Sequence, residues 1–127
     1  MKDFKKYFEL NEEPIIIYQA LTNAHTISLW TGEPAVMSTE PGSEFSWWDG
    51  SIVGKNLAFE EGKKIEQQWY FDDAEPASIV TIKLHPLKNG GTSLEIRQTN
   101  IPDEAFDDIS EGWTHTFFRA LAEFYGE

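Results

Sequence analysis

The last quarter of the chain, Pro102 to Glu127, has the pattern of one long amphipathic helix, and this pattern most constrains the fold. Acidic residues fill its first turns, Pro102 starts it and Gly126 stops it, as helix termini favour. About 22 residues give a helix of roughly 33 Å, which spans a small domain. At about 100° per residue, one narrow face carries six apolar side chains: Phe106, Ile109, Trp113, Phe117, Ala120 and Phe124.

A second apolar strip, formed by Phe118, Leu121 and Tyr125, lies beside this face. The helix is therefore apolar over more than half its circumference, which is more than one sheet face covers. It is either a well-buried core helix or a helix that lines a ligand space. Gly112 costs about 1 kcal/mol relative to alanine within a helix, which indicates a close approach or a bend beside Trp113.

The rest of the chain alternates between short apolar segments and turn residues. Residues 4–10 read as a strand, and Asn11 caps a first short helix that Pro14 helps to start. A second short helix covers 24–30. Further strands are expected over residues 43–48, 51–60, 63–71, 78–84 and 92–100.

Turn signals separate these strands. Asp49-Gly50 is typical of a two-residue hairpin turn, Gly54 indicates a bulge within its strand, and residues 72–76 read as a loop. Strands joined by tight turns pair antiparallel. We therefore expect an α+β fold in which a curved antiparallel sheet of about six to seven strands wraps around the C-terminal helix. It forms a single domain over residues 1–127.

Composition narrows the classes of partner. Twenty-two acidic and ten basic residues give a formal charge of −12, which repels nucleic acid and anionic membrane surfaces. The chain has no cysteine, which excludes disulfides and thiolate metal sites. The N-terminal MKDFKKYFEL lacks the apolar run of a signal peptide, so a cytoplasmic location is expected.

Strand alternation places many large side chains on the sheet face that meets the helix. They line a pocket for an apolar ligand or fill a close-packed core, and the pattern favours neither. Leu94 belongs to this face and Phe124 would meet it from the helix. The candidate ligand-binding residues are Trp30, Phe45, Trp47, Phe59, Gln67, Trp69, Phe71, Ile96, Gln98, Trp113 and Phe117.

Gln67 and Gln98 are polar residues at inward positions of otherwise apolar strand faces. A buried amide without a partner costs about 1–3 kcal/mol, so each needs one. They bond each other or a backbone bulge, or they orient the polar head of a ligand.

Catalytic and metal-binding patterns are lacking. His25, His85 and His115 fall on separate elements without ligand spacing. Paired acids lie at turns and helix starts, where no apolar wall raises a carboxyl pKa. We expect neither an enzyme nor a bound metal or cofactor.

A set of short motifs follows one another along the chain: Pro14, Ala20-Leu21-Thr22, Trp30-Thr31-Gly32, Gly42, Phe45, Gly50, Gly54, Trp69, Gly91-Thr92, Leu94, Ile96, Gly112-Trp113 and Leu121. In order and spacing these motifs resemble those of the START-like (SRPBCC, helix-grip) superfamily, in its Activator of Heat Shock Protein 90 ATPase homologue-like branch. The resemblance covers essentially the whole chain. It implies a sheet that grips the C-terminal helix and an internal cavity that often accommodates apolar small molecules.

Three functions follow as hypotheses. The first is a soluble protein that holds a small hydrophobic molecule, lipid-like or aromatic, between sheet and helix. The second is a co-chaperone-like interaction module with a chaperone or another protein as partner, for which Trp48, Tyr70 and Phe118 would form the exposed contact. The third is a cavity enzyme of the cyclase or hydrolase type, which would need a titratable residue inside the pocket.

Overall fold

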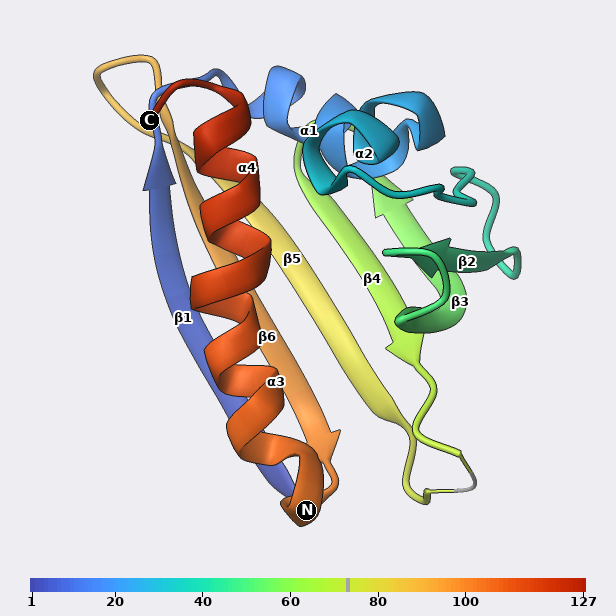
Figure 1. Ribbon diagram of the computed structural model, residues 1–127. Coiled ribbons are helices and arrows are strands. Elements are labelled where there is room, and N and C mark those ends of the chain that lie inside the picture. Colours follow the sequence, from blue (N-terminus) through green and yellow to red (C-terminus); the bar gives the residue numbers. More distant parts are fainter. Residues whose placement is uncertain (73) are drawn as a thin grey trace.

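One antiparallel sheet of six strands, in the order β1-β6-β5-β4-β3-β2, forms the body of the molecule (Figure 1). The structure is a computed structural model that describes residues 1–72 and 74–127. This architecture confirms the expected α+β class. The strands are β1 (Lys2–Leu10), β2 (Glu44–Trp47), β3 (Ile52–Glu60), β4 (Lys64–Trp69), β5 (Ser78–Pro86) and β6 (Thr92–Ile101).

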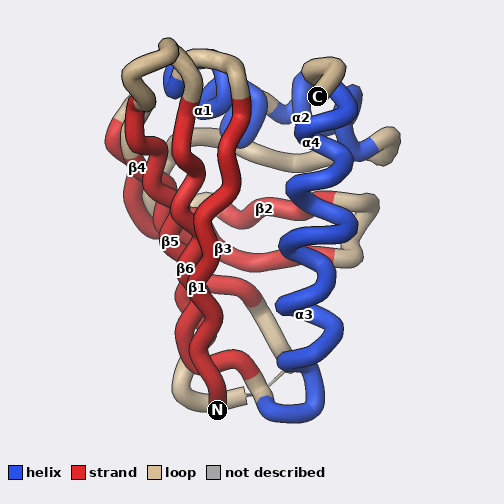
Figure 2. The backbone as a smooth tube through the Cα atoms, turned by 90° about the vertical axis from the view of Figure 1, so that its left-hand side faces the viewer, coloured by secondary structure: helices blue, strands red, loops and turns tan. Residues whose placement is uncertain are grey.

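The C-terminal helix crosses one face of this sheet, and two short helices, α1 (Pro14–Thr22) and α2 (Ala24–Thr31), cover one end (Figures 1 and 2). Seen from the side, the β2–β3 hairpin reaches from the sheet toward the helix (Figure 2). The sheet therefore curls around the helix, as expected. In order along the chain, the helix consists of a 3₁₀ turn η1 (Asp103–Ala105), α3 (Phe106–Gly112), a π-helical segment η2 (Trp113–Phe118) and α4 (Arg119–Phe124).

The π-helical segment changes which residues reach the core. Hydrogen bonds in a π-helix run from i to i+5, so each residue turns the chain by less than in an α-helix. The residues after it are therefore rotated, and Leu121 is fully buried while Phe124 is 41% exposed. The prediction that Phe124 faces the core is wrong for this reason. Phe118 was expected at the surface, but it is half-buried against Phe8, with ring centroids 4.6 Å apart.

Two predicted turn and cap details are also wrong. The first helix has Glu13 as its N-cap and Pro14 in its first turn, so Asn11 does not cap it. The β2–β3 connection is not a two-residue turn, because Trp47 pairs with Ile52 and four residues lie between them. The loop predicted over residues 72–76 includes Asp73, which lies outside the described residues.

Gly54 allows a close approach between strands. It pairs with Phe45 on one side and Trp69 on the other. A Cβ at this position would lie 1.9 Å from the carbonyl oxygen of Gln68 and 2.8 Å from the Phe45 ring. The expected bulge lies farther along β3, between Asn56 and Ala58.

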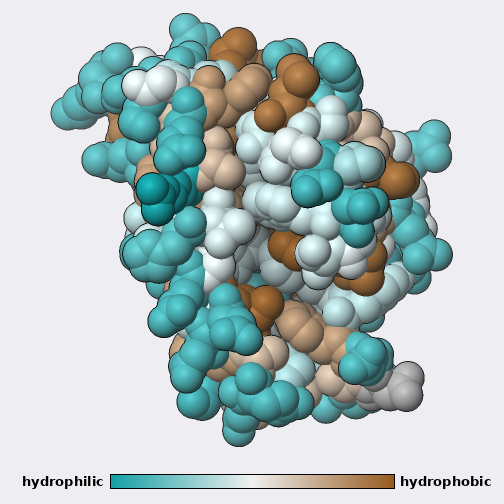
Figure 3. Space-filling view, in the orientation of Figure 1, coloured by the Kyte–Doolittle hydropathy of each residue, from teal (hydrophilic) through white to brown (hydrophobic). Residues whose placement is uncertain are grey.

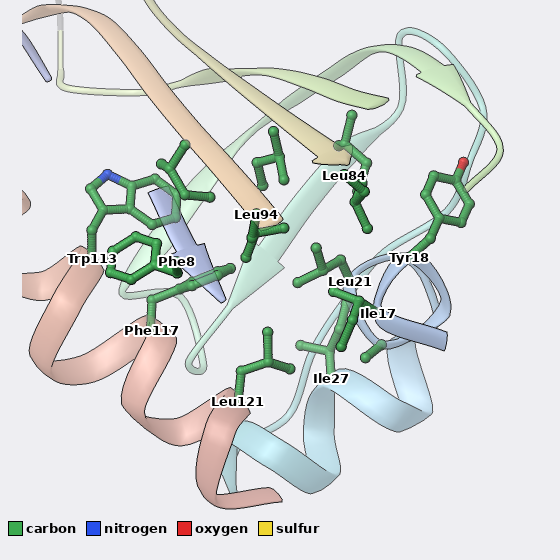
Figure 4. Close-up of a cluster of buried hydrophobic side chains, with 14 of the residues drawn as sticks. Phe8, Ile17, Tyr18, Leu21, Ile27, Leu84, Leu94, Trp113, Phe117 and Leu121 are labelled. Carbon is green, nitrogen blue, oxygen red and sulfur yellow. The ribbon is translucent and has the colours of Figure 1, made fainter. Parts of the chain in front are cut away.

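The core occupies the space between the sheet, the C-terminal helix and the two short helices. Figure 4 shows Trp113, Phe117 and Leu121 pointing from the helix toward side chains of the strands and of α1 and α2. All three are at most 2% exposed. Much of the ring-rich helix is therefore ordinary core.

Candidate functional site: a tryptophan-lined cleft

A cleft of about 340 Å³ opens between the β2–β3 connection and the C-terminal helix. Figure 3 shows this side of the molecule, with hydrophobic and near-neutral surface between the more hydrophilic flanks. Its walls are predominantly apolar, and it is open to solvent on one side. Its lining residues are Glu33, Trp48, Ser51, Ile52, Trp69, Asp108, Ile109, Gly112, Trp113, Thr116 and Phe117.

Two stacked tryptophans form one wall. The rings of Trp69, at the end of β4, and Trp113, in the C-terminal helix, have centroids 4.9 Å apart and planes 26° apart. The indole Nε1 of Trp69 donates to Gln67 Oε1 at 3.1 Å, and that of Trp113 donates to Gln98 Oε1 at 2.9 Å. We call these four residues the Trp–Gln pairs. Both indoles are held in direction as well as in position.

Both the oxygen and the nitrogen of each glutamine amide have a hydrogen-bond partner behind this wall. Gln67 Nε2 donates to Asn56 Oδ1 at 3.0 Å, and Gln98 Nε2 donates to Ser78 Oγ at 3.1 Å. Both side chains are 0% exposed. They do not bond each other, because Val80 on β5 lies between them in the sheet, and both bond side chains rather than the backbone of a bulge. Their geometry assigns them to holding the indoles.

The remaining rings pack around Phe117. Trp47 stacks on it at 5.8 Å, Trp30 meets it edge-on at 5.3 Å, and Trp48 lies at 6.2 Å. Trp48 comes from the β2–β3 connection, where it has a φ of 52°. All five tryptophans of the chain therefore gather in or directly behind the cleft.

The structure brings only part of the predicted site together at the cleft. Trp69, Trp113 and Phe117 line it. Phe59 lines a separate hollow, and Phe71 is half-buried beyond the end of β4. The other predicted residues are buried in the core behind the cleft: Trp30, Phe45, Trp47, Gln67, Ile96 and Gln98, together with Leu94.

Sequence reasoning missed several of the lining residues. Ile109, Gly112 and Thr116 are spaced as i, i+3 and i+7, so helical periodicity could have indicated that they share one face. Trp48 was expected at a protein contact, since strand alternation places it on the face opposite Trp47, but it lies in the connection after β2, where alternation no longer applies. Asp108 was expected to be solvated, as one of the paired acids at a helix start, and Glu33 was not singled out.

Gly112 contributes open space. A Cβ built at this position meets no atom within 4 Å, so the expected close approach is absent. Its backbone is helical, with φ −60° and ψ −37°. Glycine therefore widens the cleft here.

A second, more polar hollow lies beside α1 and α2. Tyr18, His25, Phe59 and Glu61 are among its lining residues. Burial, and to a lesser extent the nearby Glu61 carboxylate, raise the pKa of the Tyr18 hydroxyl above its ordinary value. The hydroxyl is therefore protonated at neutral pH and can donate a hydrogen bond there.

Residues 1–72 and 74–127 contain no group of three or more histidine or acidic side chains placed to hold a metal ion. Within the same ranges, no helix has both the length and the apolar character required to cross a membrane.

Comparison with known proteins places this geometry in a family. The family described as "Activator of Hsp90 ATPase homolog 1-like protein" matches residues 13–126. A Dictyostelium discoideum protein, "Activator of 90 kDa heat shock protein ATPase homolog", is 33% identical over 88% of this chain, which spans 31% of that relative's length.

Solved structures of similar fold support the same family assignment. The crystal structure of an HSP90 activator from Plasmodium falciparum has a TM-score of 0.89 at 26% identity, over 99% of this chain and 97% of that one. A Mesorhizobium loti protein has a TM-score of 0.83 at 24% identity, over 98% and 97% of the two chains. These matches confirm the family resemblance seen in the sequence. The chain belongs to the Activator of Hsp90 ATPase homolog 1-like family.

Proposed function

We propose that this protein binds a small, largely apolar molecule in the cleft between the β2–β3 hairpin and the C-terminal helix. The observation that carries the proposal is the wall of oriented indoles beside an unfilled volume of about 340 Å³. This volume lies at the lower end of the range for small-molecule sites, which is about 300–1,000 Å³. An aromatic ligand of one or two rings matches it.

The Trp–Gln pairs support this function. Rings in a core serve packing alone, and packing does not require a hydrogen bond from a buried amide. Here a buried amide holds each indole at the edge of an open cleft. Each pair fixes the rotation of one indole, so the wall is preformed before a ligand arrives. Preorganisation of this kind lowers the entropic cost of binding.

Filling the cleft tests the proposal. Replacing Gly112 with leucine places an apolar side chain in open space and restores helix propensity worth about 0.8–1 kcal/mol. We expect the neutral probe N-phenyl-1-naphthylamine to bind the variant at least about tenfold more weakly, about 1.4 kcal/mol, while stability is kept or raised. Probe emission measures binding, and urea unfolding measures stability.

The matched control is Glu111→Leu, which adds the same side chain to the preceding residue, an exposed position outside the cleft. The control should bind the probe as the parent protein does. Equal binding by Gly112→Leu, or no binding by the parent, contradicts the proposal. Where the variant and the control behave as expected, mass spectrometry of the molecule that co-purifies with the native protein would identify the ligand directly.

A second candidate function is a co-chaperone-like interaction, which the similarity to the named activators favours. Of the three aromatic residues expected at such a contact, only Tyr70 is exposed, at 38%. It lies beside Val53, which is 38% exposed and whose carbonyl accepts from the Tyr70 amide at 3.0 Å. Here the expected result is a faster Hsp90 ATPase in the presence of the protein, with the effect lost in Tyr70→Glu; an unchanged ATPase rate contradicts it.

A further inference from the structure

We infer that the cleft selects a cationic ligand, namely a small aromatic or aliphatic body that carries a quaternary or protonated amine. This inference rests on the proposed function and names the charge of the ligand. It is carried by the charges around the cleft and by the chemistry of its walls.

Two carboxylates belong to the lining. Glu33 follows α2 and Asp108 lies in α3, so they reach the cleft from different elements. Neither forms a salt bridge within the described part of the chain, whereas the neighbouring Asp103 pairs with the N-terminal amino group at 2.8 Å. Both carboxylates are exposed and available to a ligand.

No basic side chain offsets these acids at the cleft. The lining contains no lysine, arginine or histidine among the described residues. The helical segment 103–112 that forms one side carries five acids and no base. The whole chain has a formal charge of −12, so the long-range field also attracts cations.

The indoles add a short-range attraction. A cation within about 6 Å of an aromatic face is stabilised by the ring quadrupole, and tryptophan is the strongest partner. The chain already uses this interaction elsewhere, with Lys2 5.1 Å from the Phe106 ring centroid and Lys6 5.3 Å from that of Phe8. In the described residues no cation lies over a tryptophan ring. Trp69 and Trp113 are at most 5% exposed, so a ligand ammonium in the cleft would meet mainly the half-buried ring of Trp48.

Two isosteric probes test charge selection. In 4-hydroxyphenyltrimethylammonium and 4-tert-butylphenol the body and volume are nearly the same, and only the cationic nitrogen differs. Calorimetry at low salt should give an affinity for the cation at least about tenfold higher than for the neutral probe. Raising sodium chloride to about 0.5 M should reduce this ratio, because exposed charges are screened.

Neutralising the lining acids tests their role in charge selection. Asp108→Asn and Glu33→Gln should each lower the affinity for the cationic probe by about twofold to fivefold and leave the affinity for the neutral probe unchanged. Asp107→Asn is the matched control, since it removes the same charge from the adjacent residue, which is exposed and outside the lining. If Asp107→Asn lowers the affinity for the cationic probe as much as Asp108→Asn does, the role of the lining acids is overturned.

The outcomes separate the two proposals. Binding of both probes with equal affinity, or tighter binding of the neutral probe, overturns charge selection and leaves the proposed function standing. Binding of neither probe overturns charge selection, and it overturns the proposed function as well when N-phenyl-1-naphthylamine also fails to bind. If the parent protein prefers the cationic probe and Gly112→Leu loses this preference, the result supports both the proposed function and charge selection at this cleft.

Discussion

Replacing Trp113 with alanine is expected to lower the free energy of unfolding by about 4 kcal/mol or more. Removal of a buried tryptophan costs about 3–5 kcal/mol through lost burial and the cavity that remains. This indole is 2% exposed, and its loss also leaves Gln98 Oε1 without its donor, for about 1–3 kcal/mol more. Because small domains have a total stability of about 5–15 kcal/mol, the variant will be close to unfolding at room temperature.

Trp113→Phe separates packing from the hydrogen bond. Phenylalanine keeps a ring against Trp69 and loses the N–H, so we expect a loss of about 1–3 kcal/mol. In this background Gln98→Leu should cost less than it does alone, since the amide has already lost its partner. Urea unfolding of the four proteins gives the coupling energy as a double-mutant cycle. Additive effects would show that the Trp113–Gln98 bond does not contribute, and a loss below about 2 kcal/mol in Trp113→Ala would contradict its burial.

The second large effect is expected at Gly54. Alanine there places a methyl group 1.9 Å from the Gln68 carbonyl oxygen, so β3 and β4 must separate. Overpacking of a close-packed interior costs about 1–3 kcal/mol and at times more. Backbone atoms cannot move aside as a side chain can, so we expect about 3 kcal/mol or more. The displaced hairpin would also weaken binding of N-phenyl-1-naphthylamine.

Gly112→Ala is the matched control for this substitution. The chemical change is the same, but the new methyl group meets no atom within 4 Å apart from its chain neighbours and the backbone of its own helix, and the backbone is helical. We expect a gain of up to about 1 kcal/mol. The two variants should therefore differ in sign as measured by urea unfolding. A Gly54→Ala protein within about 1 kcal/mol of the parent would contradict the close approach of the two strands.

Local patterns predict the larger parts of this molecule. Alternation of apolar residues identifies each strand to within a few residues, and the spacing around Trp113 identifies the long helix. The π-helical segment cannot be predicted in this way, because the spacing of apolar residues before it does not differ from that of an α-helix. Phe124 illustrates this, since ideal periodicity places it inward and the wider π-helical turn rotates it to the surface.

The site is less predictable than the fold. Burial of Gln67 and Gln98 follows from strand alternation, but their partners depend on how β4 and β6 align and on where Trp113 lies above them. The cleft lies at the flank of the helix, beside Ile109 and Gly112, where a pattern of buried residues gives no warning of unfilled space. Glu33 reaches it from a connecting segment that has no periodicity.

The gathering of all five tryptophans has an optical consequence. The emission of this protein comes from indoles that line the cleft or contact its walls, so a ligand that enters changes their solvation and quenching without any label. The rings of Trp69 and Trp113, 4.9 Å apart, are close enough for their electronic transitions to couple. The Trp30–Trp48 and Trp30–Trp47 centroids are 5.4 and 6.2 Å apart, so near-ultraviolet circular dichroism reports the alignment of the whole cluster of indoles, and fluorescence titration reports occupancy of the cleft.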